Sequence, residues 1–592
     1  MVPPYRRLLA YLLRYRLRYA AGIGCLVLAA ACSLSIPWMV KSAVDALERE
    51  RAGAALGPYV LTIVLLAIGH GLARLGSRFS ILGAGQWVEH DIRADLYAHL
   101  QTLPPAFYHR HRTGDLMSRA SNDIAALRAF AGFGSVMLVG TLLTFIGTIG
   151  AMVMIDPRLT LYAMAPFPFL ILVAKRFNQD VDARSTAVQE QLGMLSAKVQ
   201  ENLTGMPVVR AYTMEEREIA EFGRLNREYL YRSVALARTQ AASWPLLGLI
   251  SGLGALIILW LGGKAVVEGR VTLGAFVAFN GYLAHLAWPT IALGWTLGNV
   301  RRGLASMHRV CEILDTTPPE ATPAEPRVAS AAPARGANAP AVLAGGGIEF
   351  RDLTFSFEGR GVALQGVSFR VPEGAMVAVV GPTGSGKSTL GLLLCRLFEP
   401  PPGTIFIAGA DVHDLPLDVL RRSVGYVPQE AFLFSRSLRD NVLLADDAAG
   451  DERLHAAAAA AGLAADVEGF PRGWDTVVGE RGLSLSGGQR QRAALARAFA
   501  GNPPYLVLDD VLASVDAGKE WEILRALRGA ASGHTALVMT HRLRAAQEAD
   551  WVVVLDEGRL VEEGRHDDLV AAGGLYARLW RVQQLEDELT QV

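Results

Sequence analysis

Residues 375–398 read AMVAVVGPTGSGKSTLGLLLCRLF, and this stretch decides the fold of the second half of the chain. The apolar run AMVAVVG is typical of a buried strand, and LGLLLCRLF continues with a helical pattern. Between them, GPTGSGKST at 381–389 fits G-x-x-x-x-G-K-[ST], a motif that requires a strand before it and a helix after it. The sequence therefore predicts an α/β domain with a phosphate-binding loop.

The types of residue in this loop suit a nucleoside triphosphate. Its glycines allow backbone N–H groups to turn toward phosphates, where a helix N-terminus adds partial positive charge. Lys387 is expected to contact the β- and γ-phosphates, and the Ser388 hydroxyl to bind Mg²⁺. The alternative, an incidental glycine-rich turn, is disfavoured because further motifs follow in order. The residues expected to contact ATP are Gly381, Pro382, Thr383, Gly384, Ser385, Gly386, Lys387, Ser388 and Thr389.

A later strand pattern ends in two acids. Residues 505–516 read YLVLDDVLASVD, so the apolar run ends at Asp509 and Asp510. A carboxylate at the end of a buried strand suits Mg²⁺, which binds oxygen ligands. One of the two acids is therefore expected to bind the metal ion, and the presence of a second needs a separate explanation.

The bulk composition indicates a protein that is partly in lipid. A chain of 592 residues is too long for a single core. It is 51% hydrophobic and only 19% charged, with a mean hydropathy of +0.26. Lys+Arg and Asp+Glu balance at 57 each, so net charge indicates neither an acidic nor a basic partner. The four cysteines lack metal or disulfide spacing and are expected to be reduced thiols.

The first half contains apolar segments long enough to cross a bilayer, which takes about 20 helical residues. Basic residues precede the first segment, and Lys175 and Arg176 end the fourth. The positive-inside rule therefore places the N-terminus in the cytoplasm. The first apolar stretch is too long for a signal-peptide core and is expected to be a retained span. The six predicted spans are about 19–40, 58–82, 132–155, 158–176, 242–266 and 271–293.

The inner connections, about 83–131 and 177–241, are long, polar and helical in pattern. Arms of about 25 residues would extend each helix pair roughly 35–40 Å beyond the membrane. Residues 316–346 are dominated by Pro, Ala and Gly, which predicts a flexible linker. The expected domains are a transmembrane domain over 1–315, this linker, and an α/β nucleotide-binding domain over 347–592.

LSGGQRQR at 485–492 resembles the signature of ATP-binding-cassette (ABC) proteins, and six spans followed by a cassette resemble an exporter-type half-transporter. The resemblance implies that Phe357 stacks on adenine and that Gln429 in GYVPQ senses the γ-phosphate and helps to bind Mg²⁺. It also implies that His541 contacts the γ-phosphate. The remaining residues implied by the resemblance are Asp509 as the Mg²⁺-linked acid, Asp516, and the set that closes over the nucleotide of the opposite subunit, Ser486, Gly487, Gly488 and Gln489.

Two segments of the membrane half are similar to the intracellular connections of these exporters. They are FYHRHRTGDLMSRASNDI at 107–124 and LTGMPVVRAYTMEERE at 203–218. The resemblance implies short coupling helices that sit in grooves on the cassettes. The alternative for either segment is a solvated amphipathic helix.

Asp510 departs from the family pattern, which has Glu as the general base at this position. The pKa values of Asp and Glu are similar, so basicity is not the difficulty. Asp is one methylene shorter, and a misplacement near 1 Å can cost on the order of 10²-fold in rate. The site is therefore expected to bind ATP well and to hydrolyse it slowly. An intact signature with an impaired base resembles one member of an asymmetric heterodimer, and a homodimer with two slow sites is the alternative.

The cargo is not evident from the sequence. His70, Arg74 and Arg78 share one helix face at i, i+4 and i+8. One interpretation is a cationic patch in the translocation path that favours amphipathic or anionic cargo. The other is that the side chains extend to the membrane–water interface or pair with acids on other helices. Four tryptophans either line a drug-like cavity or anchor spans at the membrane surface: Trp244, Trp260, Trp288 and Trp295.

The leading expectation is ATP-driven export of drug-like molecules, lipids or peptides across a bacterial inner membrane, with the cassette in the cytoplasm. Lipid flipping by the same architecture, an ATP-regulated channel or regulatory membrane protein, and an importer of the same fold are the alternatives. A soluble cassette acting on nucleic acid is excluded by the six spans. The expected cofactors are ATP and Mg²⁺, and the expected partners are a second half-transporter and the lipid bilayer.

Overall fold

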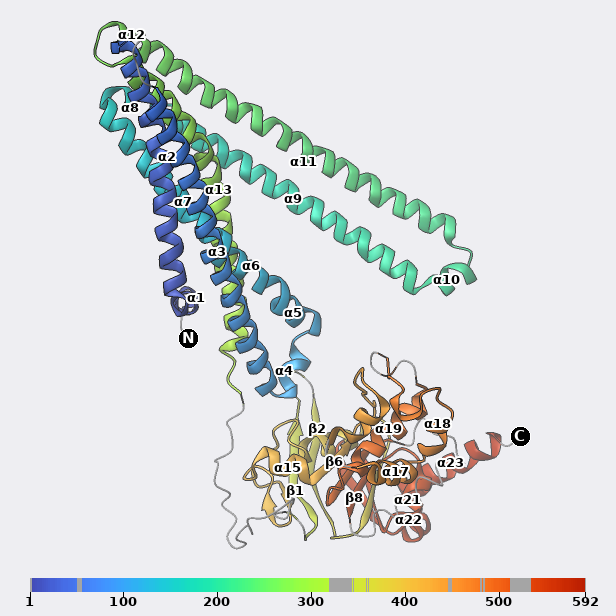
Figure 1. Ribbon diagram of the computed structural model, residues 1–592. Helices are drawn as coiled ribbons and strands as arrows, with labels where there is room; N and C mark the ends of the chain where they lie inside the picture. Colours follow the sequence, from blue (N-terminus) through green and yellow to red (C-terminus); the bar gives the residue numbers. More distant parts are fainter. Residues whose placement is uncertain are drawn as a thin grey trace. The chain divides into compact units, whose positions relative to one another are not determined.

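The computed structural model describes residues 3–50, 56–318, 343, 345–357, 359, 361–445, 450–479, 482, 485–511 and 534–590. The chain forms two compact units (Figure 1). The first consists of Met1–Thr102 and His111–Thr316, and the second of Leu103–Arg110 and Thr317–Val592. Most of the predicted linker, and Asp516 with it, lie outside the described residues.

The first unit consists of helices in its described part. Three π-helical turns, Arg119–Asp123, Phe130–Gly134 and Ile258–Gly262, lie between consecutive helices. The α-helices are α1 (Pro4–Arg14), α2 (Arg16–Glu50), α3 (Gly57–Thr102), α5 (Thr113–Ser118), α6 (Ile124–Ala129), α7 (Ser135–Ile155), α8 (Pro157–Met164), α9 (Phe167–Thr204), α10 (Met206–Ala211), α11 (Glu215–Ile257), α12 (Gly263–Val267) and α13 (Leu273–Leu314).

Three helical segments in the described part of the chain are long and apolar enough to cross a membrane: Arg16–Arg49, Gly57–Thr102 and Thr113–Ile155. They contain the first three predicted spans. Gly252–Val267 and Leu273–Leu286 are shorter apolar helices that fall within the fifth and sixth. The fourth predicted span is divided between α8 and α9, which are separated by two residues that include Pro166. The total of six spans remains a prediction.

Short polar residues fix the start of helices at the membrane links. The Asp156 carboxylate accepts hydrogen bonds from the backbone N–H groups of Arg158, at 2.8 Å, and Leu159, at 3.0 Å. This side chain caps α8, whose first residue is Pro157. The Thr272 hydroxyl caps α13 in the same way, accepting from the Ala275 N–H at 3.1 Å. The turn between α7 and α8 and the turn between α12 and α13 are therefore each closed by a side-chain cap.

Glycine allows α3 to approach the π-helical turn Phe130–Gly134 closely. A Cβ at Gly85 would lie 2.9 Å from the Cα of Gly132, closer than real Cβ contacts. Small residues at helix crossings are typical of packing between membrane helices, because they let two backbones meet.

Helices α9 and α11 pack along each other, and Figure 1 shows this pair leaving the bundle of α2, α3, α7 and α13. Helix α10 connects the far ends of the pair. The polar connection predicted over 177–241 is therefore a helical arm with a short helix at its tip.

The second unit is an α/β domain with a six-stranded sheet of order β10-β9-β3-β8-β7-β6 and a four-stranded sheet of order β2-β1-β4-β5. Its strands are β1 (Ile348–Ser356), β2 (Val362–Val371), β3 (Met376–Val380), β4 (Ile405–Ile407), β5 (Ala410–Asp411), β6 (Val424–Val427), β7 (Tyr505–Asp509), β8 (Thr535–Met539), β9 (Trp551–Asp556) and β10 (Arg559–Gly564). Its helices include α4 (Pro105–Arg110), α14 (Lys387–Leu394), α15 (Leu417–Ser423), α16 (Leu438–Val442), α17 (Asp451–Ala460), α18 (Ala464–Glu468), α19 (Gly487–Ala500), α21 (Leu543–Gln547), α22 (His566–Ala572) and α23 (Leu575–Thr590).

Both faces of the larger sheet are covered. In β7, Leu506 and Leu508 belong to one hydrophobic cluster, whereas Tyr505 and Val507 belong to another. Because alternate side chains along a strand point to opposite faces, each face packs against its own layer. A strand buried on both faces has a continuous apolar sequence, which explains the run YLVL.

The strands that end at the motifs are parallel neighbours. β3 pairs in parallel with β8, β8 with β7, and β7 with β6. Their carboxyl ends therefore lie at one edge of the sheet, where open α/β sheets bind ligands. This topology collects residues from four distant segments into one site.

Candidate nucleotide-binding site

The phosphate loop lies between a fully buried strand and a helix, as the sequence predicts. β3 ends at Val380, and α14 begins at Lys387. Three glycines in between have positive φ: Gly381 at 152°, Gly384 at 85° and Gly386 at 96°. Glycine adopts such angles without the steric cost of a Cβ.

Space is a second reason for glycine in this loop. A Cβ at Gly381 would lie 2.0 Å from the Leu555 carbonyl oxygen, and one at Gly386 would lie 2.6 Å from the Ala363 carbonyl oxygen. Any side chain at either position would therefore displace backbone of a neighbouring strand. The loop conformation depends on glycine for both angle and space.

The Lys387 ammonium bridges the loop. Its Nζ donates to the carbonyl oxygens of Gly381, at 2.8 Å, and Pro382, at 2.9 Å, and to the Ser385 hydroxyl at 3.4 Å. Burial lowers the pKa of Lys387, an effect that Asp510 and Asp509 oppose. A desolvated cation inside a ring of backbone groups is suited to an anionic ligand with several oxygens.

Ser388 and Asp509 are brought together as predicted for a magnesium site. The Ser388 hydroxyl donates to Asp509 Oδ1 at 2.9 Å. Burial raises the pKa of Asp509 above its usual value, and the neighbouring Asp510 adds to this effect. Two hard oxygen ligands, one of them a destabilised carboxylate, fit Mg²⁺, which uses few protein ligands beside substrate phosphates. In the described part of the chain, no cluster of three His, Cys, Asp or Glu side chains offers a complete metal cage.

Asp510 is the centre of a polar cluster. Its carboxylate accepts from His541 Nδ1, at 2.8 Å to Oδ1 and 2.9 Å to Oδ2, and from Gln429 Nε2 at 3.3 Å. The Nδ1 atom of His541 must therefore carry a proton, which leaves Nε2 for another partner. The side chain of Asp510 is 11% exposed and that of His541 is 53% exposed, so the pair has one buried and one accessible member.

The three residues predicted to be catalytic, Asp510, His541 and Gln429, are thus in direct contact. Gln429 was also predicted to bind Mg²⁺, but its side chain contacts Asp510 rather than Ser388 or Asp509. Its role at the metal remains a prediction.

Gln491 is a site residue that the sequence interpretation missed. Its Nε2 donates to the backbone carbonyl oxygens of Asp510, at 3.2 Å, and Gln429, at 3.3 Å. The side chain is 4% exposed, and its Oε1 is buried without a hydrogen-bond partner. Gln491 lies in the quoted LSGGQRQR stretch, whose last residues were interpreted only as part of a signature. The sequence does not show that the Gln491 side chain points from α19 toward Asp510, so its role could not be predicted.

The signature forms the N-terminus of α19. Ser486 caps the helix, because its Oγ accepts from the Gln489 N–H at 3.2 Å while Gln489 Oε1 accepts from the Ser486 N–H at 3.0 Å. An ion pair at 2.6 Å between Arg492 and Asp466 holds the same helix. A capped helix start that begins with Gly487 and Gly488 is a suitable anion site.

The phosphate loop and the signature are not bonded to each other in the part of the chain that the structure describes. Among the described residues, no hydrogen bond or ion pair joins 381–389 to 486–489. Gln489 instead donates to Asp466 at 3.5 Å. The two predicted nucleotide-contacting sets are therefore separate in this subunit.

Phe357, predicted to stack on adenine, lies in an aromatic cluster. Its ring is 5.1 Å from that of Phe355 and 5.0 Å from that of Phe398, both edge to face. The ring of His109, in α4, lies 5.6 Å from Phe398. The short helix α4 therefore packs within the second unit beside the adenine-stacking candidate. Adenine stacking remains a prediction.

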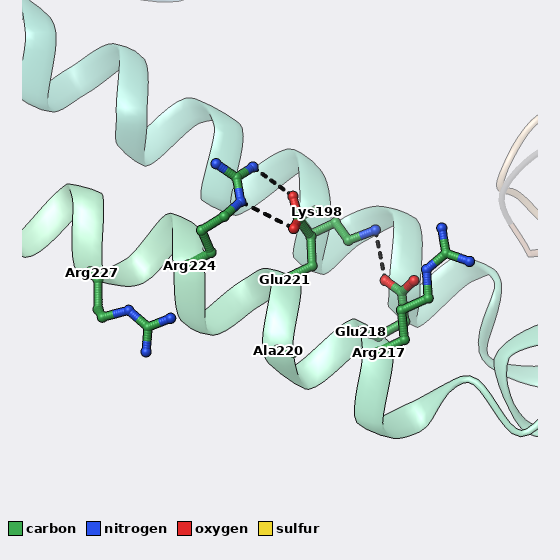
Figure 2. Close-up of a pocket in the computed structure, with 7 residues that line it drawn as sticks. All are labelled: Lys198, Arg217, Glu218, Ala220, Glu221, Arg224 and Arg227. Carbon is green, nitrogen blue, oxygen red and sulfur yellow. Dashed lines mark hydrogen bonds and ion pairs between the residues drawn. The ribbon is translucent and has the colours of Figure 1, made fainter.

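Outside the nucleotide site, a hollow of about 600 Å³ lies between the arms α9 and α11. Figure 2 shows its charged lining, with Lys198 paired to Glu218 at 2.6 Å and Arg224 paired to Glu221 at 2.7 Å. Two of the four cations that line it, Lys198 and Arg224, pair with adjacent acids, and all four lie on helices rather than in a glycine-rich loop, so the hollow does not resemble the phosphate loop.

Comparison with known proteins agrees with this geometry. The family model for the ABC transporter transmembrane region matches residues 19–290, and the ABC transporter model matches residues 364–513. The chain is 33% identical to the probable multidrug resistance ABC transporter ATP-binding/permease protein YheI of Bacillus subtilis, over 96% of both chains. It is 31% identical to the ATP-dependent lipid A-core flippase of Syntrophus aciditrophicus, over 99% of this chain and 95% of the relative.

Solved structures give the same result. The structure of a bacterial Atm1-family ABC exporter with ATP bound has a TM-score of 0.76 and 28% identity, covering 96% of this chain and 99% of that one. The chain belongs to the ABC transporter family. It is a multi-pass membrane protein in which a helical exporter domain is fused to an α/β nucleotide-binding domain, and it couples ATPase activity to transport.

Proposed function

We propose that this chain is one half of a dimeric exporter for hydrophobic or amphipathic compounds in a bacterial inner membrane, and that its own ATP site turns over slowly. Relatives named as multidrug transporters and as a lipid A-core flippase support drug-like molecules and lipids as cargo classes. The N-terminus and the nucleotide-binding domain would face the cytoplasm, following the positive residues beside the first span.

The separation of phosphate loop and signature supports a dimer. Each nucleotide would be held between the Gly381–Thr389 loop of one subunit and the Ser486–Gln489 helix start of the other. Helix α10 supports the same conclusion, because none of its residues is buried in this chain and Val208 is 57% exposed. By contrast, Phe107 in α4 is 7% exposed. One short helix thus packs on its own cassette, and the other would pack on the partner's.

The geometry of Asp510 is the single observation that supports slow ATP turnover at this chain's site. Its short carboxylate is tied to His541 and Gln429, and its backbone N–H donates to the Met539 carbonyl oxygen at 2.7 Å. A carboxylate held this way has little freedom to reach a water molecule at the γ-phosphate, and proton transfer needs heavy atoms about 2.6–3.2 Å apart. Ser388 and Asp509 would hold Mg²⁺, which supplies charge neutralisation for the phosphates.

These features support an asymmetric dimer, with a homodimer of two slow sites as the alternative. The intact signature of this chain would complete the partner's ATP site. The partner would have Glu at the position equivalent to Asp510, directly after its metal-binding acid. Expressing the chain alone and with its neighbouring reading frame, then measuring phosphate release, tests this proposal. We expect slow turnover alone and faster turnover together. Fast turnover by the chain alone, unchanged by Asp510→Asn, would contradict it.

Lipid flipping is the second candidate, because the same architecture serves it and one relative is named as a flippase. Inside-out vesicles supplied with ATP and either a fluorescent drug or a labelled lipid separate the two candidates. Movement of the lipid but not the drug would favour the flippase.

A further inference from the structure

Four helices of the first unit surround a hollow that holds the charged residues singled out in the second span. Its volume is about 480 Å³. His70, Arg74 and Arg78 line it from α3, and His285 lines it from α13. Much of the remaining wall is apolar, with Leu26 from α2 and Met137 from α7 among its members. The three α3 residues therefore face a common space, as their spacing predicts.

The arginines in this hollow have no acidic partner. No Asp or Glu lines it, and in the described part of the chain neither Arg74 nor Arg78 forms an ion pair. Further along the same helix, Glu89 pairs with Arg93 at 2.6 Å and with Arg128 at 3.3 Å. Pairing with acids of this chain, one part of the second interpretation, is therefore wrong within the described residues, and extension to the interface stays a prediction.

His70 is held in one orientation. Its Nδ1 lies 2.9 Å from the Ala29 carbonyl oxygen, and because a carbonyl only accepts, this nitrogen must donate. Its Nε2 is left for another group. The histidine is thus fixed between α2 and α3 beside the arginines.

A second hollow adjoins the arginines. It has a volume of about 560 Å³ and is lined by Arg74 and Arg78 together with Ile68, Gly71, Leu72 and Leu75. The arginines thus border both spaces, and Leu72 is 64% exposed. A ligand with a compact anionic end and an apolar body matches this arrangement, because guanidinium groups bind carboxylate and phosphate in a two-pronged geometry.

We propose that Arg74 and Arg78 bind the anionic head group of amphiphilic cargo, with the apolar part of the cargo against Leu26 and Met137. This proposal rests on the proposed export function and narrows its substrate class. An unpaired cation at membrane depth is costly and usually faces a water-filled cavity or a partner. An anionic head group supplies such a partner.

Binding in the absence of ATP tests the proposal directly. The full chain in lipid nanodiscs is titrated with dodecyl phosphate, dodecanoate, dodecyl maltoside and dodecyltrimethylammonium, each competing with a fluorescent alkyl probe. We expect both anionic probes to bind at least about tenfold more tightly than the neutral and cationic ones. Dodecyl phosphate against dodecanoate separates a phosphate head group from a carboxylate.

Variants assign the preference to the arginines. The double change Arg74→Gln and Arg78→Gln should remove the anionic preference, whereas the double change to Lys should keep part of it. Arg158→Gln, an exposed arginine outside both hollows, is the matched control and should bind as the parent does. Retained ATP binding by each variant shows that the chain is folded.

An anionic preference that survives the double Gln change, or equal binding of all four probes by the parent, would overturn the proposal. If the double Gln variant does not fold, the comparison of the four probes on the parent and the Lys variant still decides. Anionic binding that persists while ATP-driven uptake of the same probe into inside-out vesicles is absent would overturn the export function and leave the site intact.

Discussion

Asp510 has a backbone φ of +51°, a left-handed conformation that Asp adopts more readily than most residues. Its N–H bond to Met539 and its carboxylate contacts to His541 fix both ends of the residue. Hydrogen bonds therefore fix the position of both the backbone and the side chain of Asp510. In the slow site that we propose, the cost to catalysis would arise from the length of the side chain.

Asp510→Glu should raise ATP turnover at the site that contains this chain's phosphate loop. The added methylene extends the carboxylate by roughly 1 Å, and correct placement of a base is worth on the order of 10²-fold. Phosphate release by the purified chain measures the change, and Asp510→Asn is the matched variant that should lower the residual rate. Equal rates for all three proteins would show that Asp510 does not limit turnover.

Asp509→Asn should stabilise the nucleotide-free protein at neutral pH. Burial raises the pKa of Asp509 in the folded protein, so ionised Asp509 lowers the free energy of unfolding above that pKa. Below the unfolded pKa, about 3.9, the carboxyl is protonated in both states and the gain disappears. Thermal unfolding of both proteins across this pH range tests the sign. A gain that grows as the pH falls would contradict it.

At the scale of elements, α19 connects two functions. Its start carries the signature, and one turn later Gln491 donates to the carbonyl oxygens of Asp510 and Gln429. Movement at the start of α19 would therefore shift the backbone of Asp510, the candidate base. In the proposed dimer, the helix would connect the site shared with the partner to the site built on this chain.

Gln491→Leu should lower ATP turnover with little change in ATP affinity. The change removes both hydrogen bonds and leaves the buried carbonyl group of Asp510 unsatisfied, which costs about 1–3 kcal/mol. Turnover and nucleotide binding are measured on the same preparation, with Gln583→Leu on α23 as a control outside the site. Gln583 also bonds to the backbone, although as an acceptor: its Oε1 accepts from the Leu543 N–H at 2.6 Å. A loss of ATP affinity equal to the loss of turnover would contradict the positioning role.

The tip of the α9–α11 arm gives a second prediction at this scale. Val208→Asp places a charge on the exposed surface of α10, which we expect to be covered by the partner, and burying an unpaired charge is unfavourable. ATP-driven transport should fall while the chain still folds. Val561→Asp on β10, where the valine is 47% exposed, is the matched control. Equal transport by the two variants would indicate that α10 is not covered.

At the scale of the whole molecule, each chain of the proposed asymmetric dimer would provide half of two different sites. An asymmetric dimer therefore predicts unequal effects of changes in one chain. Gly488→Asp, in the signature offered to the partner, should lower turnover on the order of 10²-fold because a carboxylate would face phosphate oxygens. Lys387→Ala, in this chain's slow site, should have a much smaller effect on the total rate.

Phosphate release by the co-expressed pair measures both changes. Equal and complete losses from Gly488→Asp and Lys387→Ala would indicate two equivalent sites, and therefore a homodimer. ATP binding to this chain's loop, followed with a fluorescent ATP analogue, should be lost in Lys387→Ala whichever dimer forms.

The sequence by itself determined those features that depend on neighbouring residues along the chain. The loop at 381–389, the acid at the end of YLVLD and the first three apolar segments could all be predicted, because glycine spacing and hydrophobic runs act locally. The family signature added the identity of Gln429 and His541 as partners in one site. The break in the fourth predicted span lies at Pro166, because proline lacks the N–H group that a helix interior needs.

Only the tertiary structure decided which of these residues touch. The contacts of Asp510 with His541, Gln429 and Gln491 join four segments at one sheet edge, and the inward direction of Gln491 has no local signal. The unpaired state of Arg74 and Arg78 likewise depends on what α2, α7 and α13 place around α3. Local patterns fix the elements, whereas the charge balance of a site depends on side chains that are distant in the sequence.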